Sequence, residues 1–427
     1  MNASAKIGRV ARTISGTGFP EDAQGDTTGM PFIKVSDLSA APNISGIVGA
    51  QNYVTQDTVV RLGARIAPAG SVVFPKVGAA LLKNTRRLLL VDACMDNNLM
   101  GVYPLQGEPR FWKYAFDLVD LAELSPGGPL PYVSDSQVRD LEIPFPGLEE
   151  QRRIADFLDV ETSRIDKITA GKRASAHLLE ERIDVVADNL IRGVHESNHC
   201  PSGYGPLGET PIGWMEGRLR SIECEVQTGP FGSQLHADDY IENGWPVINP
   251  ANITRDGLQQ DSQVTVSDEV RERLGRHILQ SGDVVFARRG ELGRSSVVGD
   301  AQAGWVCGTG SLRLRINQSL FNSSYLHRYL QIPAIRHYFQ KQSVGSTMAN
   351  LNTSILLSMP LLIPPFDEQE KIARECDREE YYFSMLTAKI NRQLELLQER
   401  KQALITAAVT GQIDVTTAGR ATSDLRA

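Results

Sequence analysis

Two stretches of the chain carry mainly apolar residues at alternating steps of four and three. This spacing puts them on one face of an α-helix and, over about five to six heptads, is typical of a coiled coil. In the first stretch the positions are Ile154, Leu158, Glu161, Ile165, Ile168, Lys172, Ala176, Leu179, Ile183, Val186 and Leu190. In the second they are Ile372, Cys376, Glu379, Phe383, Leu386, Ile390, Leu394, Leu397, Lys401, Leu404 and Ala408.

Residues at the ends of these stretches set their limits. Prolines 144 and 146 precede the first stretch, and prolines 364 and 365 precede the second, while Gly193 and Gly411 follow where a left-handed C-cap is expected. A helix of some 40 residues is roughly 60 Å long and needs a packing partner. We expect the two helices to pair with each other, antiparallel; an ordinary bundle or a homodimeric coil is the alternative.

The two stretches are copies of one another. When the chain is compared with itself at an offset of 218 residues, positions 150–193 fall on 368–411 without a gap, and 13 of the 44 positions are identical. With small shifts the repeat extends upstream, where Gly70-Ser-Val-Val-Phe74 matches Gly282-Asp-Val-Val-Phe286. The whole chain is therefore predicted to be a tandem duplication with a pseudo-two-fold axis.

Each copy begins with a globular region of mixed α and β structure. Strands are predicted at 71–74, 87–91, 283–286 and 312–316, and a helix at 325–340 that Pro333 interrupts. The fold class is α+β, with two similar α/β domains joined by the two long helices. We predict domains at 1–144 and 211–364, helices at 145–195 and 365–412, a linker at 196–210 and a tail at 413–427.

Composition narrows the class of protein. The 427 residues are 41% hydrophobic, which allows a sizeable core, and carry a net charge of −7, which argues against indiscriminate binding to polyanions. The five cysteines are scattered without a C-x-x-C pair, so we expect no disulfide framework and a reducing, cytoplasmic location. No signal-peptide core or membrane span is visible in the sequence.

Charge is unevenly distributed along the chain. Residues 141–200 and 361–427 carry net charges of −4 and −2, whereas the globular regions are close to neutral. Lys76 follows the Val-Val-Phe strand of the first copy as Arg288 follows that of the second. Other basic residues lie nearby: Lys83, Arg86, Arg87, Arg289 and Arg294. Arginine binds guanine bidentately and lysine binds phosphate, so these clusters are candidate DNA contacts; an ordinary solvated surface is the alternative.

Catalytic patterns are not evident. The segment Asn249-Pro-Ala-Asn252 lacks the second proline and aromatic residue of an amino-methyltransferase box, and there is no phosphate-binding P-loop. The single E-x-K triplet, Glu399-Arg-Lys401, lies within a predicted helix. His195, His199 and Cys200 have zinc-like spacing without a fourth ligand nearby, so no metal site is predicted. The sequence favours a non-catalytic binding protein.

These features together resemble one family. Residues 363–372 (IPPFDEQEKI) and 397–413 resemble the C-terminal conserved region of type I restriction-modification specificity (S) subunits, and residues 143–193 resemble their central conserved region. The loop 229–233 (GPFGS), with 282–288 and Gly290, resembles their target recognition domains. The first copy has no obvious counterpart of that loop, although 15–20 (SGTGFP) is in a suitable place.

The resemblance implies a function for each part. Each globular domain would recognise one half of a bipartite DNA site, and the helices would set the spacing and dock two modification (methyltransferase) subunits. S-adenosylmethionine, ATP and Mg²⁺ would belong to those subunits and to restriction subunits, and this chain would hold no cofactor. A protein-interaction scaffold, or an enzyme with an unrecognised site, are the alternatives.

Two sets of candidate residues follow. The candidate DNA contacts are Lys34, Lys76, Lys83, Arg86, Arg87, Ser233, Gln234, Arg288, Arg289 and Arg294. The candidates for the coiled coil and for docking of partner subunits are Ile154, Leu158, Ile165, Leu179, Ile372, Phe383, Leu386, Leu397 and Leu404.

Overall fold

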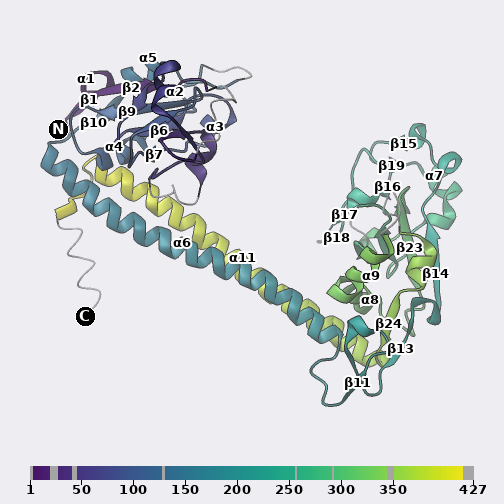
Figure 1. Ribbon diagram of the computed structural model, residues 1–427. Coiled ribbons are helices and arrows are strands. Elements are labelled where there is room, and N and C mark those ends of the chain that lie inside the picture. Colours follow the sequence, from purple (N-terminus) through teal and green to yellow (C-terminus); the bar gives the residue numbers. More distant parts are fainter. Residues whose placement is uncertain are drawn as a thin grey trace. The chain divides into compact units, whose positions relative to one another are not determined.

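The chain forms two compact units in a computed structural model that describes residues 3–19, 27–40, 46–126, 130–254, 257–290, 293–343 and 351–416 (Figure 1). Unit 1 comprises Met1–Lys172 and Asn391–Ala427, and unit 2 comprises Arg173–Ile390. Two 44-residue helices, α6 (Leu148–Ile191) and α11 (Phe366–Val409), each contribute one part to unit 1 and the other to unit 2.

Unit 1 contains two four-stranded sheets. The first is antiparallel, in the order β2 (Ala11–Ser15), β9 (Leu99–Pro104), β6 (Val72–Pro75), β7 (Arg87–Leu88). The second has the order β4 (Asn52–Val54), β3 (Met30–Ile33), β8 (Ala93–Met95), β5 (Ile66–Ala67), with β3 and β8 parallel. The short helices are α1 (Ile7–Val10), α2 (Gln56–Arg61), α3 (Ala79–Leu82), α4 (Pro109–Phe116) and α5 (Asp135–Asp140), and β1 (Ser4–Lys6) pairs with β10 (Glu142–Pro144).

Unit 2 repeats this arrangement except at the edges of its mixed sheet, where β15 (Tyr240–Ile241) is additional and the counterpart of β5 is a single bridge between Ile278 and Val306. Its antiparallel sheet has the order β14 (Cys224–Thr228), β23 (Ser311–Ile316), β20 (Val284–Ala287), β21 (Ser295–Val297). Its mixed sheet has the order β15 (Tyr240–Ile241), β19 (Thr265–Val266), β16 (Trp245–Ile248), β22 (Val306–Cys307), with β16 and β22 parallel. The remaining elements are β11 (His199–Pro201), β12 (Glu209–Pro211), β13 (Met215–Arg218), β17 (Ile253–Thr254), β18 (Gly257–Leu258), β24 (Pro360–Ile363), α7 (Asp268–Arg273), α8 (Ser323–Gln331), α9 (Pro333–Ser343) and α10 (Thr353–Leu357).

The shared strand order confirms the duplication predicted from sequence. In both antiparallel sheets the Val-Val-Phe strand, β6 or β20, lies inside the sheet and its residues are buried. The parallel pair β3–β8 corresponds to β16–β22. The mixed α and β fold class predicted above is therefore present in each unit.

The predicted strand over 87–91 was wrong in extent. Only Arg87 and Leu88 pair with β6, and Leu89 forms a separate bridge with Ile47. Leu88 packs on one hydrophobic cluster and Leu89 lies in another, so the chain crosses between two cores at this point. The strand over 312–316 lies inside β23, as predicted.

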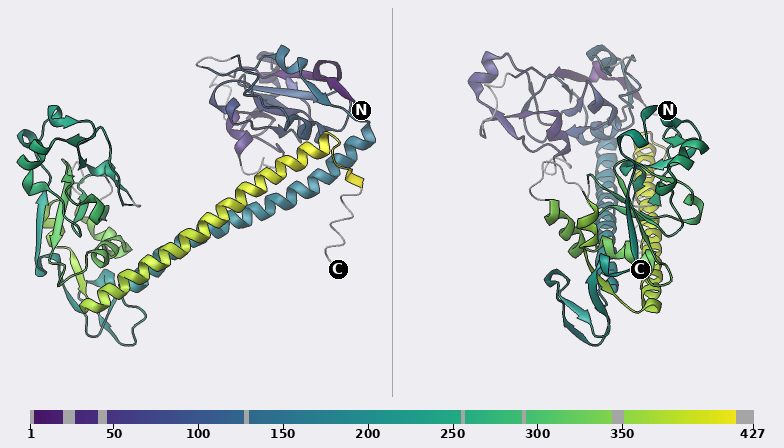
Figure 2. Two further views of the ribbon diagram at one scale, coloured as in Figure 1. Left: turned by 180° about the vertical axis from the view of Figure 1, so that it is seen from behind. Right: turned by 90° about the vertical axis from the view of Figure 1, so that its right-hand side faces the viewer.

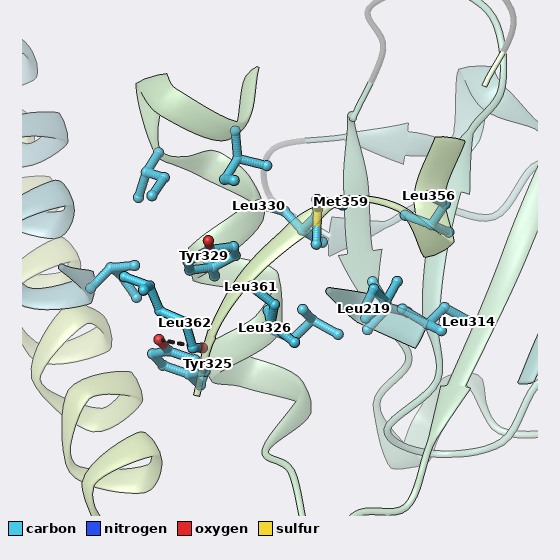
Figure 3. Close-up of a cluster of buried hydrophobic side chains, with 14 of the residues drawn as sticks. Leu219, Leu314, Tyr325, Leu326, Tyr329, Leu330, Leu356, Met359, Leu361 and Leu362 are labelled. Carbon is cyan, nitrogen blue, oxygen red and sulfur yellow. Dashed lines mark hydrogen bonds between the residues drawn. The ribbon is translucent and has the colours of Figure 1, made fainter. Parts of the chain in front are cut away.

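Pro333 divides the helix expected over 325–340. It is the first residue of α9, and the preceding Ile332 is extended, which is the conformation that a following proline favours. Figure 3 shows Tyr325 and Tyr329 of α8 pointing into the core of unit 2 beside Leu361 and Leu362 of β24. The hydroxyl of Tyr325 donates to the carbonyl of Leu362 at 3.3 Å, which satisfies a buried phenol.

The two long helices pack against each other with antiparallel polarity in each unit. In unit 1 the core contains Leu158 from the beginning of α6 and Ile405 from the end of α11, and the two helices lie side by side there (Figure 2). Lys401 donates to Asp166 at 2.6 Å. In unit 2 Ile191 from the end of α6 lies in one core with Ile372 from the beginning of α11. Coiled-coil geometry in the strict sense stays a prediction.

Burial along the helices follows the predicted stripe with one exception. Five of the nine coiled-coil candidates are buried and the other four are half-buried. The buried ones are Ile154, Leu158, Ile165, Ile372 and Phe383. Ile168, which we placed on the stripe, is 42% exposed, and Thr169 is half-buried in its stead. From Ile165 the buried face therefore advances by four residues, not three, before it rejoins the predicted positions at Lys172.

Two other stretches bear on the predicted organisation. The stretch predicted as a linker, 196–210, includes the paired strand β11 and the start of its partner β12. Residues 417–427 of the predicted tail lie outside the described part. The same holds for residues 345–347 (Gly-Ser-Thr), where the sequence predicts a loop. Among the described residues, no helix combines the length and apolar character that crossing a membrane requires.

Candidate nucleic-acid interface

In unit 2 several strand ends meet at one edge of the two sheets. Gly229, after β14, donates its N–H to Ser311 O at 2.9 Å. Arg288, after β20, donates its N–H to Gly310 O, and Gly308, after β22, donates to Ile248 O, both at 2.9 Å. These backbone bonds bring the loop 229–233, Arg288 and the turn 308–310 into one group, which we call the strand-end cluster of unit 2.

Unit 1 has a matching strand-end cluster. Gly16, after β2, donates its N–H to Leu99 O at 3.1 Å, and Lys76, after β6, donates to Asn98 O at 2.8 Å. Asp96, after β8, donates its N–H to Ile33 O at 2.9 Å. Lys76 and Arg288 therefore occupy the same structural position, as the repeat predicted.

In both strand-end clusters two backbone segments approach so closely that one position must be glycine. A Cβ atom on Gly229 would lie 1.9 Å from the carbonyl oxygen of Gly308, and one on Gly16 would lie 1.8 Å from that of Asp96. Only glycine fits at either position. Gly16 is thus the counterpart of Gly229 that the sequence left open; Pro20, at the end of the proposed counterpart loop, lies outside the described residues.

Arg288 is held in a defined orientation. Its guanidinium carbon lies 5.2 Å from the ring centre of Phe231, a cation–π contact. Its Nε donates to Leu351 O at 3.2 Å, and its carbonyl accepts from the N–H of Leu351 at 2.9 Å. Burial, together with the neighbouring Arg289, lowers the pKa of Arg288 from its usual value.

The other candidates of unit 2 differ in accessibility. Ser233, Gln234 and Arg289 are exposed, and the side-chain oxygen of Gln234 accepts from the N–H of Phe231 at 3.1 Å, which orders the loop. Arg294 is half-buried, and its Nη2 donates to Pro250 O at 2.7 Å. Arg294 therefore supports the turn after β16.

Three candidates of unit 1 are lysines, which differ in burial and in their neighbours. Lys76 is half-buried, and burial lowers its pKa, although Asp135 and Asp96 act in the opposite direction. Lys34 lies at the end of β3, with its ammonium 5.9 Å from the ring of Phe32. Lys83 is exposed.

Arg86 requires a correction. Its side chain is buried, and its guanidinium donates to the carbonyl oxygens of Val119 and Asn84. Asn84 adopts a left-handed conformation with φ of 50°, which turns the chain so that the arginine enters the domain. Arg86 is thus a structural residue and leaves the candidate set. Arg87 is half-buried and donates to Arg86 O at 2.8 Å.

Two buried glutamines lie at matching positions of the repeat and were not predicted from the sequence. The side chain of Gln151 accepts from the N–H of Glu108 at 2.9 Å and donates to Pro146 O at 2.8 Å. Gln369 does the same with Asn322 N and Pro364 O, both at 2.9 Å. Each glutamine joins the start of a long helix to the start of α4 or α8. The pair Glu-Gln recurs at the same place in both copies, and this recurrence was the sequence signal that could have predicted the role of the glutamine.

Arginines on the same short helices make a second connection. Arg110 of α4 donates to Asp156 and Asp159 of α6, both at 2.8 Å. Arg328 of α8 donates to Asp377 of α11 at 2.7 Å and also to Glu380. Asp159 and Asp377 are separated by the repeat offset of 218 residues, so the same carboxylate position serves both domains. These bonds join α4 to α6 in unit 1 and α8 to α11 in unit 2.

A groove of about 540 Å³ in unit 2 lies between α6, α11 and the domain. His327 and Arg294 line it, and Ser295 lies 3.3 Å from His327 Nδ1. Burial, with Arg328 adding repulsion, lowers the pKa of His327 to about 4. The ring is therefore neutral at physiological pH.

One group of potential metal ligands occurs among the described residues. His195, Glu196 and Glu368 place ligand atoms within 4.8 Å of one another. Glu368 also accepts a hydrogen bond from Trp214 at 3.0 Å, and His199, the other histidine of the zinc-like spacing, contacts Gly193 O at 3.0 Å. The three residues with zinc-like spacing, His195, His199 and Cys200, are therefore not the group that converges, in agreement with the expectation that their spacing alone makes no metal site.

Curated relatives of this chain are similar at low identity. The specificity subunit of the type I restriction enzyme MjaVIII from Methanocaldococcus jannaschii is 22% identical over 298 residues, covering 68% of this chain and 66% of that protein. The EcoBI specificity subunit from Escherichia coli is 20% identical, covering 66% of this chain and 60% of that protein. The chain therefore spans somewhat less than two thirds of the length of these relatives.

Solved structures share the fold. A chain from work on complex assembly and conformational transition of the type I R-M system has a TM-score of 0.73 at 17% identity, over 95% of this chain and 97% of that one. The HsdS subunit from Thermoanaerobacter tengcongensis has a TM-score of 0.55 at 20% identity, over 96% and 97%.

A family model matches both copies of the repeat. The model describes the type I restriction modification DNA specificity domain, and it matches residues 3–176 and again 211–396. Each match includes one globular domain with its strand-end cluster and most of the long helix that follows. The chain belongs to the type I restriction modification DNA specificity domain family.

Proposed function

We propose that this chain is a non-catalytic DNA specificity subunit in which each strand-end cluster recognises one half of a bipartite site. The observation that carries this proposal is that one framework is built twice with different side chains. Lys76 takes the place of Arg288. Asp96 takes the place of Gly308, next to the glycine (Gly16 or Gly229) that both copies share. A repeated framework with altered polar groups suits two different base sequences.

Two linked domains gain by acting on one DNA molecule. Once the first domain binds, the second is held at a high effective concentration, so two moderate contacts give tight binding. We propose that α6 and α11 set the gap between the half-sites. The glutamine and arginine contacts described above support this role, because they join each domain to the helices.

We also propose that the helices dock two modification subunits. Both helices expose large apolar side chains that a docked subunit would cover: Val160, Leu178 and Val185 on α6, and Tyr381, Tyr382 and Met385 on α11. The duplicated helices would offer two similar surfaces. Restriction subunits would join the larger complex, and S-adenosylmethionine, ATP and Mg²⁺ would be bound by these partners.

The test is co-purification of the chain with a modification subunit, followed by DNA footprinting. We expect two protected blocks separated by an unprotected gap, with an affinity that falls steeply as salt rises. A single continuous block would contradict bipartite recognition. Salt-independent or absent DNA binding by the assembled complex would instead favour a protein-interaction scaffold.

Methyl transfer provides a second readout. We expect none from the purified chain alone, and transfer at the target from the complex with modification subunits. Transfer by the chain alone would contradict the non-catalytic assignment.

A further inference from the structure

We propose that Arg288 determines specificity in unit 2 by binding a guanine with the Nη1 and Nη2 edge of its guanidinium. This inference deepens the proposed function and rests on it. The sequence offered ten candidate residues of equal standing. Among the contacts of the described residues, Arg288 is the candidate whose guanidinium stacks on an aromatic ring.

The first step is the orientation of the side chain. The Phe231 ring supports one face of the guanidinium at 5.2 Å, and the Leu351 carbonyl binds Nε at 3.2 Å. The Arg288 backbone is fixed too, because its N–H binds Gly310 O and its carbonyl binds Leu351 N, both at 2.9 Å. A side chain ordered before binding loses less conformational entropy when it meets DNA.

The second step concerns the Nη1 and Nη2 edge of the Arg288 guanidinium, which is left available for a ligand. Nε is already bonded, and no residue in the described part of the chain accepts a hydrogen bond from Nη1 or Nη2. Two parallel N–H donors match the N7 and O6 acceptors on the major-groove edge of guanine. Phe231 is 52% exposed, so the ring on which the arginine stacks is open to solvent.

The third step is the comparison with unit 1. Lys76 occupies the same position but presents a single ammonium group, and Asp96 and Asp135 lie close enough to affect its pKa. A lysine is a point charge without the planar fork of arginine. Arg288 therefore recognises a base in its half-site in a way that Lys76 cannot reproduce in the other.

The experiment uses the full chain assembled with its modification subunits, on the target identified by methylome sequencing. Each guanine in the target is replaced in turn by 7-deazaguanine, which lacks only the N7 acceptor, and dissociation constants are measured for wild type, Arg288→Ala and Lys76→Ala. Inosine at the same position is the matched DNA control, because it keeps N7 and O6.

At one guanine we expect 7-deazaguanine to weaken wild-type binding severalfold, with little further effect on Arg288→Ala. Arg288→Ala should lose discrimination at that position by roughly 5- to 140-fold, the range for a bidentate pair. Lys76→Ala should keep the full sensitivity there, and inosine should bind as guanine does. Phe231→Leu should lose part of the discrimination, because the stack that orients the arginine is gone.

Other outcomes distinguish a failure of the Arg288 inference from a failure of the proposed function. If Arg288→Ala weakens every DNA equally and its effect simply adds to that of 7-deazaguanine, Arg288 contacts a phosphate, and the inference is wrong while the proposed function stands. A target with no guanine in either half-site overturns it as well. Loss of all specific binding by the wild-type complex overturns the proposed function itself.

Discussion

At the scale of single residues, the contacts that matter most are buried polar ones. Gln369 is 1% exposed and bonds both Asn322 N and Pro364 O. The basic residues that follow the strands were predicted from their charge to be surface contacts. The side-chain amides of Gln151 and Gln369 are uncharged, so the charge pattern did not predict a role for them. Arg86 shows the converse error, since position in sequence alone cannot reveal that a left-handed residue at 84 directs it inward. Burial is a property of the fold that a charge count does not contain.

Gln369→Ala should destabilise unit 2. The substitution leaves the buried C=O of Pro364 and the part-buried N–H of Asn322 without their partners, and a fully buried group of this kind costs about 1–3 kcal/mol. Chemical denaturation should show an unfolding midpoint that moves to lower denaturant. Gln398→Ala, on an exposed position of the same helix, is the control and should leave the midpoint unchanged. Equal midpoints for both variants would mean that the bridging role is absent.

The buried His327 predicts a pH dependence. Its folded pKa, about 4, lies below the usual 6.5 because burial disfavours the charged ring. Between these values the unfolded chain binds a proton that the folded chain does not, so stability is lost as pH falls from 6.5 toward 4. The loss is at most about 3 kcal/mol, since the ring lines a groove that water reaches.

The variant His327→Gln tests this dependence. We expect the free energy of unfolding of the variant to change less between pH 6.5 and 4 than that of wild type. His337→Gln, at an exposed position in the same domain, should keep the wild-type slope. Identical slopes for wild type and His327→Gln would show that this histidine is protonated equally in both states.

At the scale of elements, the sequence predicted the long helices well. Their four-three spacing, the prolines before them and the glycines after them agree with α6 and α11, because these signals are local. The step at Ile168 was wrong, since a heptad pattern allows either of two neighbouring residues to face the partner. The strand-end clusters combine loops from several strands, so only the match between copies pointed to Lys76 and Arg288.

The helix packing predicts a contrast between two leucines of α6. Leu158 is buried against α11, and Leu158→Ala should cost about 2–5 kcal/mol of stability because it leaves a cavity. Leu178 is 64% exposed, and Leu178→Ala should change stability by less than about 0.5 kcal/mol. Thermal unfolding of the two variants measures this contrast. Similar losses for both would contradict the assigned buried face.

At the scale of the whole molecule, the proposed function accounts for the duplication, because two copies of one domain would let a single chain recognise an asymmetric sequence. Each copy supplies the same two sheets, the same glycine contact and the same glutamine bridge, while residues at the strand ends differ. The framework is thus separated from the recognition residues. Substitutions in the strand-end cluster of unit 2 should alter the recognition of one half-site and leave the recognition of the other unchanged.

The most direct test of bipartite recognition is methylome sequencing of cells with and without this chain, in the presence of its modification subunits. We predict that the chain-dependent methylated sites share two short defined sequences separated by an unspecified gap of constant length. Arg288→Ala should relax only one of the two sequences. A single uninterrupted sequence, or a gap whose length varies from site to site, would contradict the account.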